Sequence, residues 1–132
     1  MSELTQGSRQ QYALKEAGLW LKQRYPGSKR MMTANSIAIP YYSQGIMMAL
    51  PYADSSVALR YIHKKRPDFV VLEGRTIKLR PYIREWIEKG IPDGAAQRIY
   101  AKGTSIEDRI AIFRFNWISP SQLISSPDAP AK

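Results

Sequence analysis

The strongest feature in the hydrophobic pattern of this chain is the apolar run Phe-Val-Val-Leu at residues 69–72. The run follows Pro67 and ends at Glu73-Gly74, so a turn signal stands at each end. A strand that is apolar on both faces is typical of the middle of a parallel sheet covered by helices on both sides. We therefore predict that residues 68–74 form a buried central strand.

Three segments carry apolar residues at the three- and four-residue spacing of amphipathic helices. The first spans residues 8–25, the second follows the cap residue Asp54 and ends before Pro67, and the third begins at Pro81 and ends at Gly90. The pattern predicts that each helix turns its apolar stripe towards the central strand.

Two smaller features accompany these helices. A helical turn is expected to begin at Asn35 or Ser36, since either can cap it, and Pro40 is expected to limit its length. Tyr12 and Leu19 fall on the side of the first helix opposite its apolar stripe. They are either incidental surface residues or contacts with a neighbour outside this chain.

Short apolar segments at residues 29–33, 46–50, 98–101 and 109–115 predict four further strands. The last two, joined by a loop, predict an antiparallel hairpin whose second strand lies inside the sheet because both of its faces are apolar. The expected fold class is α/β, a small Rossmann-like three-layer sandwich with a mainly parallel sheet of about five strands. Residues 8–117 are expected to form this single domain.

The segment 118–132 differs in composition from the rest of the chain. It mixes Pro, Ser and Ala without a hydrophobic period. Such a segment cannot bury enough apolar surface to offset the entropy of ordering, so we predict a disordered tail.

Composition excludes several kinds of site. The 132 residues contain no cysteine and one histidine, His63, so disulfides, thiolate nucleophiles and a conventional zinc site are not expected. We interpret His63 as a solvated helix residue. No window approaches eighteen consecutive apolar residues and the N-terminus does not resemble a signal peptide. This predicts a soluble chain, either cytoplasmic or a soluble part of a larger membrane protein.

The net charge of +9 predicts an anionic partner, such as nucleic acid, acidic lipid headgroups or phosphorylated substrates. One basic cluster ends the second helix, where cations oppose the negative end of the helix dipole. A second group of basic residues follows the central strand and is expected to be exposed. The residues predicted to contact an anionic surface are Lys64, Lys65, Arg66, Lys78 and Arg80, with Arg75 also exposed.

Ligands of open α/β sheets bind beyond the carboxyl ends of the strands. The residues that follow three predicted strands there are Asn35, Ser36, Tyr52, Asp54, Glu73 and Arg75. Asp54 is interpreted first as a helix cap, and Glu73 as a carboxylate that neutralises Arg75. The chain contains no GxGxxG, phosphate-binding P-loop, GxSxG or HExxH motif, which counts against a free-standing enzyme.

Several short motifs, in order, resemble those of one protein family. They are Gly18-Leu-Trp-Leu-Lys, Tyr25-Pro-Gly-Ser-Lys, Met31-Met-Thr, Ile39-Pro-Tyr-Tyr-Ser-Gln-Gly, Leu50-Pro-Tyr-Ala-Asp, Asp68-Phe-Val-Val-Leu-Glu and Leu79-Arg-Pro. Over about residues 10–115, the chain resembles the soluble C-terminal domain of bacterial membrane glycosyltransferases related to dolichyl-phosphate-mannose-protein mannosyltransferases.

The resemblance implies an extracytoplasmic, periplasmic domain at the bacterial inner membrane. In that family the spanning helices and the acidic catalytic loop precede this domain, and the sugar comes from a polyprenyl-phosphate donor. The chain by itself is then expected to be non-catalytic, with no catalytic residue, metal or cofactor of its own. The implied partners are the transmembrane part of the same polypeptide, anionic lipid or the polyprenyl-phosphate sugar, and a glycan or protein acceptor.

Two alternatives from other classes remain open at the level of sequence. The charge also fits a basic cytoplasmic module that binds nucleic acid, although no helix-turn-helix, zinc-finger or RRM signature is present. A small sugar-nucleotide enzyme would need to hold its ligand near Asn35 and Arg75.

Overall fold

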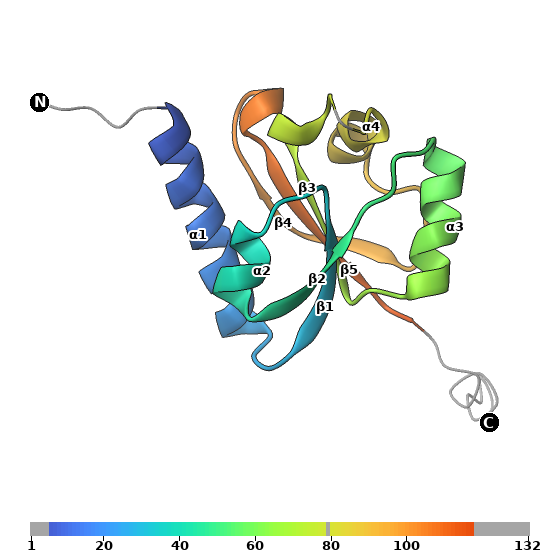
Figure 1. The fold of residues 1–132 in the computed structure, drawn as a ribbon, viewed down its shortest axis with the longest axis horizontal. Helices are drawn as coiled ribbons and strands as arrows, with labels where there is room; N and C mark the ends of the chain where they lie inside the picture. Colours follow the sequence, from blue (N-terminus) through green and yellow to red (C-terminus); the bar gives the residue numbers. More distant parts are fainter. Residues whose placement is uncertain (1–5, 79, 118–132) are drawn as a thin grey trace, which may run out of the picture.

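The computed structural model describes residues 6–78 and 80–117, and it is an α/β fold (Figure 1). The tail at 118–132, which we predicted to be disordered, lies outside these residues. The elements in chain order are α1 (Gln6–Arg24), β1 (Lys29–Thr33), α2 (Ala38–Ser43), β2 (Gly45–Ala49), α3 (Ser55–Lys65), β3 (Phe69–Glu73), the 3-10 turn η1 (Gly74–Thr76), α4 (Tyr82–Lys89), β4 (Ala96–Lys102), the 3-10 turn η2 (Ile106–Asp108) and β5 (Ile110–Phe115).

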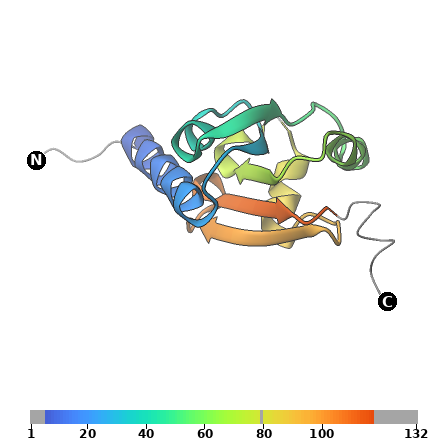
Figure 2. The same ribbon diagram turned by 90° about the horizontal axis from the view of Figure 1, so that it is seen from below.

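The five strands form one sheet in the order β2-β1-β3-β5-β4. β1 pairs in parallel with β2 and β3, whereas β5 pairs antiparallel with both β3 and β4. Figure 2 shows this order from β2 at the top to β4 at the bottom. The predicted fold class is confirmed, and so are the central place of β3 and the internal place of β5.

The strand β3 is central because its side chains supply both cores of the three-layer structure. Phe69 and Val71 point towards α1 and α2, and Val70 and Leu72 point towards α3 and α4, all of them 3% exposed or less. Figure 1 shows α1 and α2 on one side of the sheet and α3 and α4 on the other. The uninterrupted apolar run at 69–72 therefore has the physical cause that the pattern predicted.

Two local predictions were wrong. The helix α2 continues through Pro40 to Ser43, because Pro40 stands in its first turn, where a backbone N–H has no partner within the helix. In the segment after β3, Arg75 and Lys78 are exposed as predicted, but Arg80, which was predicted to lie on the surface, is buried and only 1% exposed. The segment also forms η1 and buries Thr76.

None of the helices within residues 6–78 and 80–117 is both long and apolar enough to cross a membrane.

Candidate functional site

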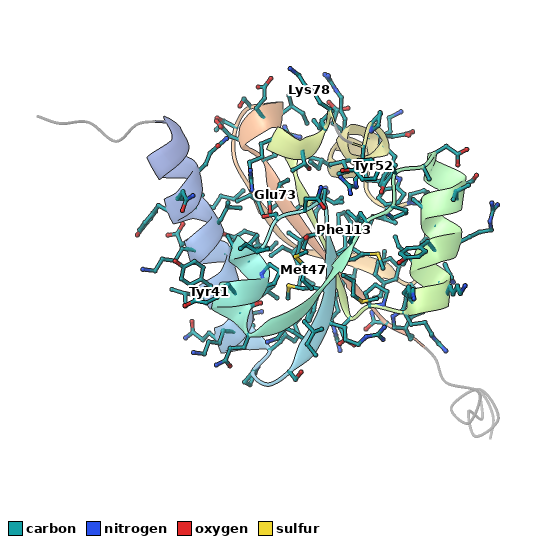
Figure 3. All side chains as sticks on the ribbon, in the orientation of Figure 1. Tyr41, Met47, Tyr52, Glu73, Lys78 and Phe113 are labelled. Atoms are coloured by element: carbon teal, nitrogen blue, oxygen red, sulfur yellow. The ribbon has the colours of Figure 1, made fainter. Side chains whose placement is uncertain are left out.

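The carboxyl ends of β1, β2 and β3 meet at one edge of the sheet, because these three strands are parallel. Figure 3 shows Tyr52, Glu73 and Lys78 towards this end of the sheet. In the order β2-β1-β3, the chain passes from β1 to β2 on one side of β1 and then crosses to β3 on the other side. In open α/β sheets, such a switch point is where ligands bind.

Two predicted loops meet at this edge through Arg75. Its Nε donates to Glu73 Oε1 at 2.7 Å, and its Nη2 donates to Ser36 Oγ at 3.2 Å. Glu73 is 3% exposed, and its Oε2 has no hydrogen-bond partner. Arg75 thus neutralises a buried carboxylate, as predicted, and joins the loop after β3 to the loop after β1.

The loop after β1 is held in place by its own side chains. Thr33 Oγ1 donates to Ser36 O at 2.8 Å and accepts from Ser36 N–H at 3.3 Å. Asn35 between them has a left-handed backbone, with φ of 60°, which asparagine tolerates better than most residues. This conformation leaves Asn35 exposed while Ser36 is buried.

A second connection joins the loops after β1 and β2. Asn35 Nδ2 donates to Tyr52 Oη at 3.1 Å, and the Tyr52 ring stands over Arg80, with the guanidinium carbon 3.8 Å from the ring centroid. Arg80 Nε donates to Leu50 O at 2.8 Å, and Tyr82 Oη donates to Pro51 O at 2.8 Å. Leu50-Pro-Tyr therefore contacts Arg80 and Tyr82, which are far from it in sequence.

Asp54 does not join this cluster. Its carboxylate accepts from Val57 N–H at 2.9 Å and from Ser56 Oγ at 3.0 Å, so it caps α3. These hydrogen bonds, the Val57 bond first, lower the pKa of Asp54. The interpretation of Asp54 as a helix cap is confirmed.

A small hollow adjoins Glu73 and Arg75. Its volume is about 20 Å³, and Gln10 of α1, Asp108 and Arg109 also line it. This is room for about one water molecule rather than for a substrate. The hollow can therefore hydrate the buried carboxylate, but it is too small for a sugar.

The five residues predicted to contact an anionic surface do not form one surface. Lys64, Lys65 and Arg66 precede the amino end of β3, whereas Lys78 and Arg80 follow its carboxyl end, about 15 Å away along a five-residue strand. In addition, Arg80 is buried. The five residues therefore do not form a single basic patch.

Another polar cluster lies near the amino ends of the strands. His63 Nε2 contacts Asp93 Oδ2, and the His63 ring packs edge-on against Trp117, with centroids 5.2 Å apart. His63 and Trp117 line an open hollow of about 310 Å³. His63 is half-exposed, as predicted, but the pairing with Asp93 was not predicted, because thirty residues separate the two and neither forms a recognisable motif.

The chain segment that contains β2 is apolar and almost uncharged. Residues 31–59 contain one charged residue, Asp54, in a chain that is 23% charged. Among the described residues, six of the eight exposed large apolar side chains lie in this segment: Ile37, Tyr41, Ile46, Met47, Tyr52 and Val57. Figure 3 shows Tyr41, Met47 and Tyr52 spread from α2 across β2 to the following loop. We call these six residues the β2 face.

No protein-family model matches this chain, and no curated protein or solved structure matches it either. Within residues 6–78 and 80–117, no group of three or more His, Asp or Glu side chains is placed to hold a metal ion. The chemistry of the site must therefore be argued from the residues themselves. These offer hydrogen bonds, an aromatic ring and guanidinium groups, which suit binding of an anion.

Proposed function

We propose that this chain is an extracytoplasmic domain of an integral membrane glycosyltransferase that uses a polyprenyl-phosphate-linked sugar. The domain serves the transferase by docking onto its membrane-embedded part, and the bond-making groups lie in that part. The observation that carries the proposal is the β2 face, an apolar surface at an open sheet edge. The resemblance of the ordered motifs to this family supports the same conclusion.

The two edges of the sheet differ in a way that supports docking at β2. The edge strand β4 exposes Gln97, Arg98 and Lys102 and has a register irregularity between Arg98 and Tyr100. Charges and bulges of this kind keep an edge strand from pairing with other chains. β2 has the sequence Gly-Ile-Met-Met-Ala, without a charge or a proline, and the described sheet ends there. An edge without such protection is suited to being covered.

The exposure of the β2 face has an energetic consequence. Ile46 is 57% exposed and Met47 is 40% exposed, although each lies in the middle of a regular strand. Covering apolar surface is favourable by about 25 cal/mol per Å². Large apolar side chains left exposed on a folded domain are candidates for an interaction site.

Fractionation of the cells that encode this sequence tests the proposal. An antibody against the purified domain should detect a polypeptide larger than 15.1 kDa in the membrane fraction. Protease added to intact spheroplasts should destroy the epitope, because the domain lies outside the cytoplasm. A 15 kDa product that stays soluble and is protected from the protease would refute the proposal.

The docking surface can be tested separately with a photo-crosslinking amino acid. At position 47, on β2, it should form adducts with a hydrophobic peptide of the membrane-embedded part. The matched control is position 97, an exposed position on the opposite edge strand. Equal adduct formation at the two positions would exclude the β2 face as the docking surface.

A further inference from the structure

The side chain of Arg80 is the most unusual charged group in the described structure. It is 1% exposed, and its Nη1 is buried with no hydrogen-bond partner. Its Nε donates to the Leu50 carbonyl at 2.8 Å, and its guanidinium packs against the ring of Tyr52. A guanidinium remains charged at any physiological pH. Within residues 6–78 and 80–117, no carboxylate forms an ion pair with it.

A buried charge without an opposite charge is costly, by several kcal/mol for an ion of this kind. Glu73, the buried carboxylate at the same end of the sheet, is already bound to Arg75 at 2.7 Å. A purely structural arginine would need its donors to be satisfied by carbonyls, and one of them is not. The arrangement is explained if an anion from outside the chain completes it.

Tyr52 covers the guanidinium and separates it from solvent. Tyr52 is 66% exposed, and its hydroxyl accepts a 3.1 Å hydrogen bond from the exposed Asn35. A hydrogen bond between two exposed groups contributes little, because water replaces it readily. Moving the Tyr52 ring aside would break this hydrogen bond and the cation–π contact with Arg80, and an anion bound to the guanidinium would offset the loss.

The surroundings favour an anion over a cation or a neutral ligand. Lys78 is exposed on the same loop, and Arg75 is partly exposed in the preceding turn η1. The helix α4 begins at Tyr82, two residues after Arg80, and no side chain caps its N-terminus. The positive end of a helix dipole adds to the attraction of these cations for an anion.

We propose that Arg80 is the anion-binding residue of a phosphate site at the carboxyl edge of the sheet, and that Tyr52 is its cover. The planar fork of a guanidinium matches phosphate oxygens better than an ammonium does. The ligand class is a phosphate ester, either a free sugar phosphate or the headgroup of a polyprenyl phosphate. The site itself is argued from Arg80 and its surroundings, and only the choice of a polyprenyl phosphate as one source of the phosphate rests on the proposed function.

Nuclear magnetic resonance on the wild-type protein gives the first test. The Arg80 Nε–H signal should shift on titration with inorganic phosphate and not with chloride at the same ionic strength. Glucose 1-phosphate and phosphatidylcholine vesicles with or without a polyprenyl phosphate then identify the source of the phosphate. Binding of either phosphate source supports the site. An Arg80 signal that moves with none of the three phosphates overturns it.

Variants provide the second test. Arg80→Met keeps an apolar stem and should weaken phosphate binding by about tenfold or more, the effect of losing a charged hydrogen bond. Lys64→Ala, at the other end of β3, removes the same charge and should leave binding within about twofold. Tyr52→Ala should strengthen binding, because no cover has to move. Equal losses in Arg80→Met and Lys64→Ala, or no gain in Tyr52→Ala, would show general electrostatic attraction instead.

Discussion

Replacing Gly74 by alanine tests how tightly the turns η1 and η2 pack beside the candidate site. A Cβ at Gly74 would lie 1.7 Å from Ile106 O and 2.8 Å from Ile106 C, and both atoms belong to the backbone. Ordinary contacts between such atoms are about 3.5 Å. Gly74 cannot retreat freely, because its N–H donates to Arg109 O at 2.8 Å. The two turns must therefore separate or this hydrogen bond must break.

The magnitude follows from these two costs. Overpacking against rigid neighbours costs about 1–3 kcal/mol, and the lost hydrogen bond adds about 1 kcal/mol. We expect Gly74→Ala to lower the free energy of unfolding by about 3 kcal/mol. In urea, this would move the unfolding midpoint by about 1.5–2 M. Fluorescence of the buried Trp86 can follow the transition.

The same substitution can be made at two other glycines, which have different surroundings. Gly18→Ala places a Cβ 2.6 Å from Tyr42 Cβ, but alanine also favours the helix by about 1 kcal/mol, so the net loss should be about 1 kcal/mol. Gly94 has no atom within 4 Å of its Cβ position and no positive φ. Gly94→Ala should therefore stabilise the protein by about 0.4–1 kcal/mol. If Gly74→Ala unfolds at the wild-type midpoint, or if this rank order is reversed, the packing argument fails.

Three further predictions concern titration and buried charge. Burial raises the pKa of Tyr82 from 10.0 to about 12, so its contribution to stability should be complete below pH 10 and disappear as the pH rises to about 12. In an absorbance titration, the tyrosine component with a pKa of about 12 should be absent from Tyr82→Phe. Arg75→Ala leaves Glu73 buried without its partner and should lower the free energy of unfolding by about 1–2 kcal/mol, less than for a fully buried pair because Arg75 is partly exposed. Adding Glu73→Gln should restore part of the lost stability. A wild-type urea midpoint in Arg75→Ala would contradict the argument. Asp54→Ala should lower the urea midpoint at neutral pH, and the difference should shrink as the pH falls from 3.8 through the lowered pKa of Asp54, whereas a difference that persists in acid would exclude a carboxylate cap.

The candidate site could be predicted only in part. The rule that ligands bind beyond the carboxyl ends of parallel strands correctly grouped Ser36, Glu73 and Arg75, which the structure joins directly. It could not identify Arg80 as part of the group. A charged residue such as Arg80 predicts a surface position. Its buried position depends on the carbonyl of Leu50 and the ring of Tyr52, both distant in sequence.

The sequence by itself determined the layers of this protein. Backbone hydrogen bonding and the need to bury apolar side chains act on neighbouring residues, so the run at 69–72 and the helical stripes predict a central strand and its covering helices. The tertiary structure alone decided which charges meet and which surface stays open. Lys64 and Lys78 lie near opposite ends of β3, His63 contacts Asp93, and the uncharged strand β2 forms one edge of the described sheet. These outcomes depend on strand order and loop geometry, and both are settled by contacts between residues far apart in the chain.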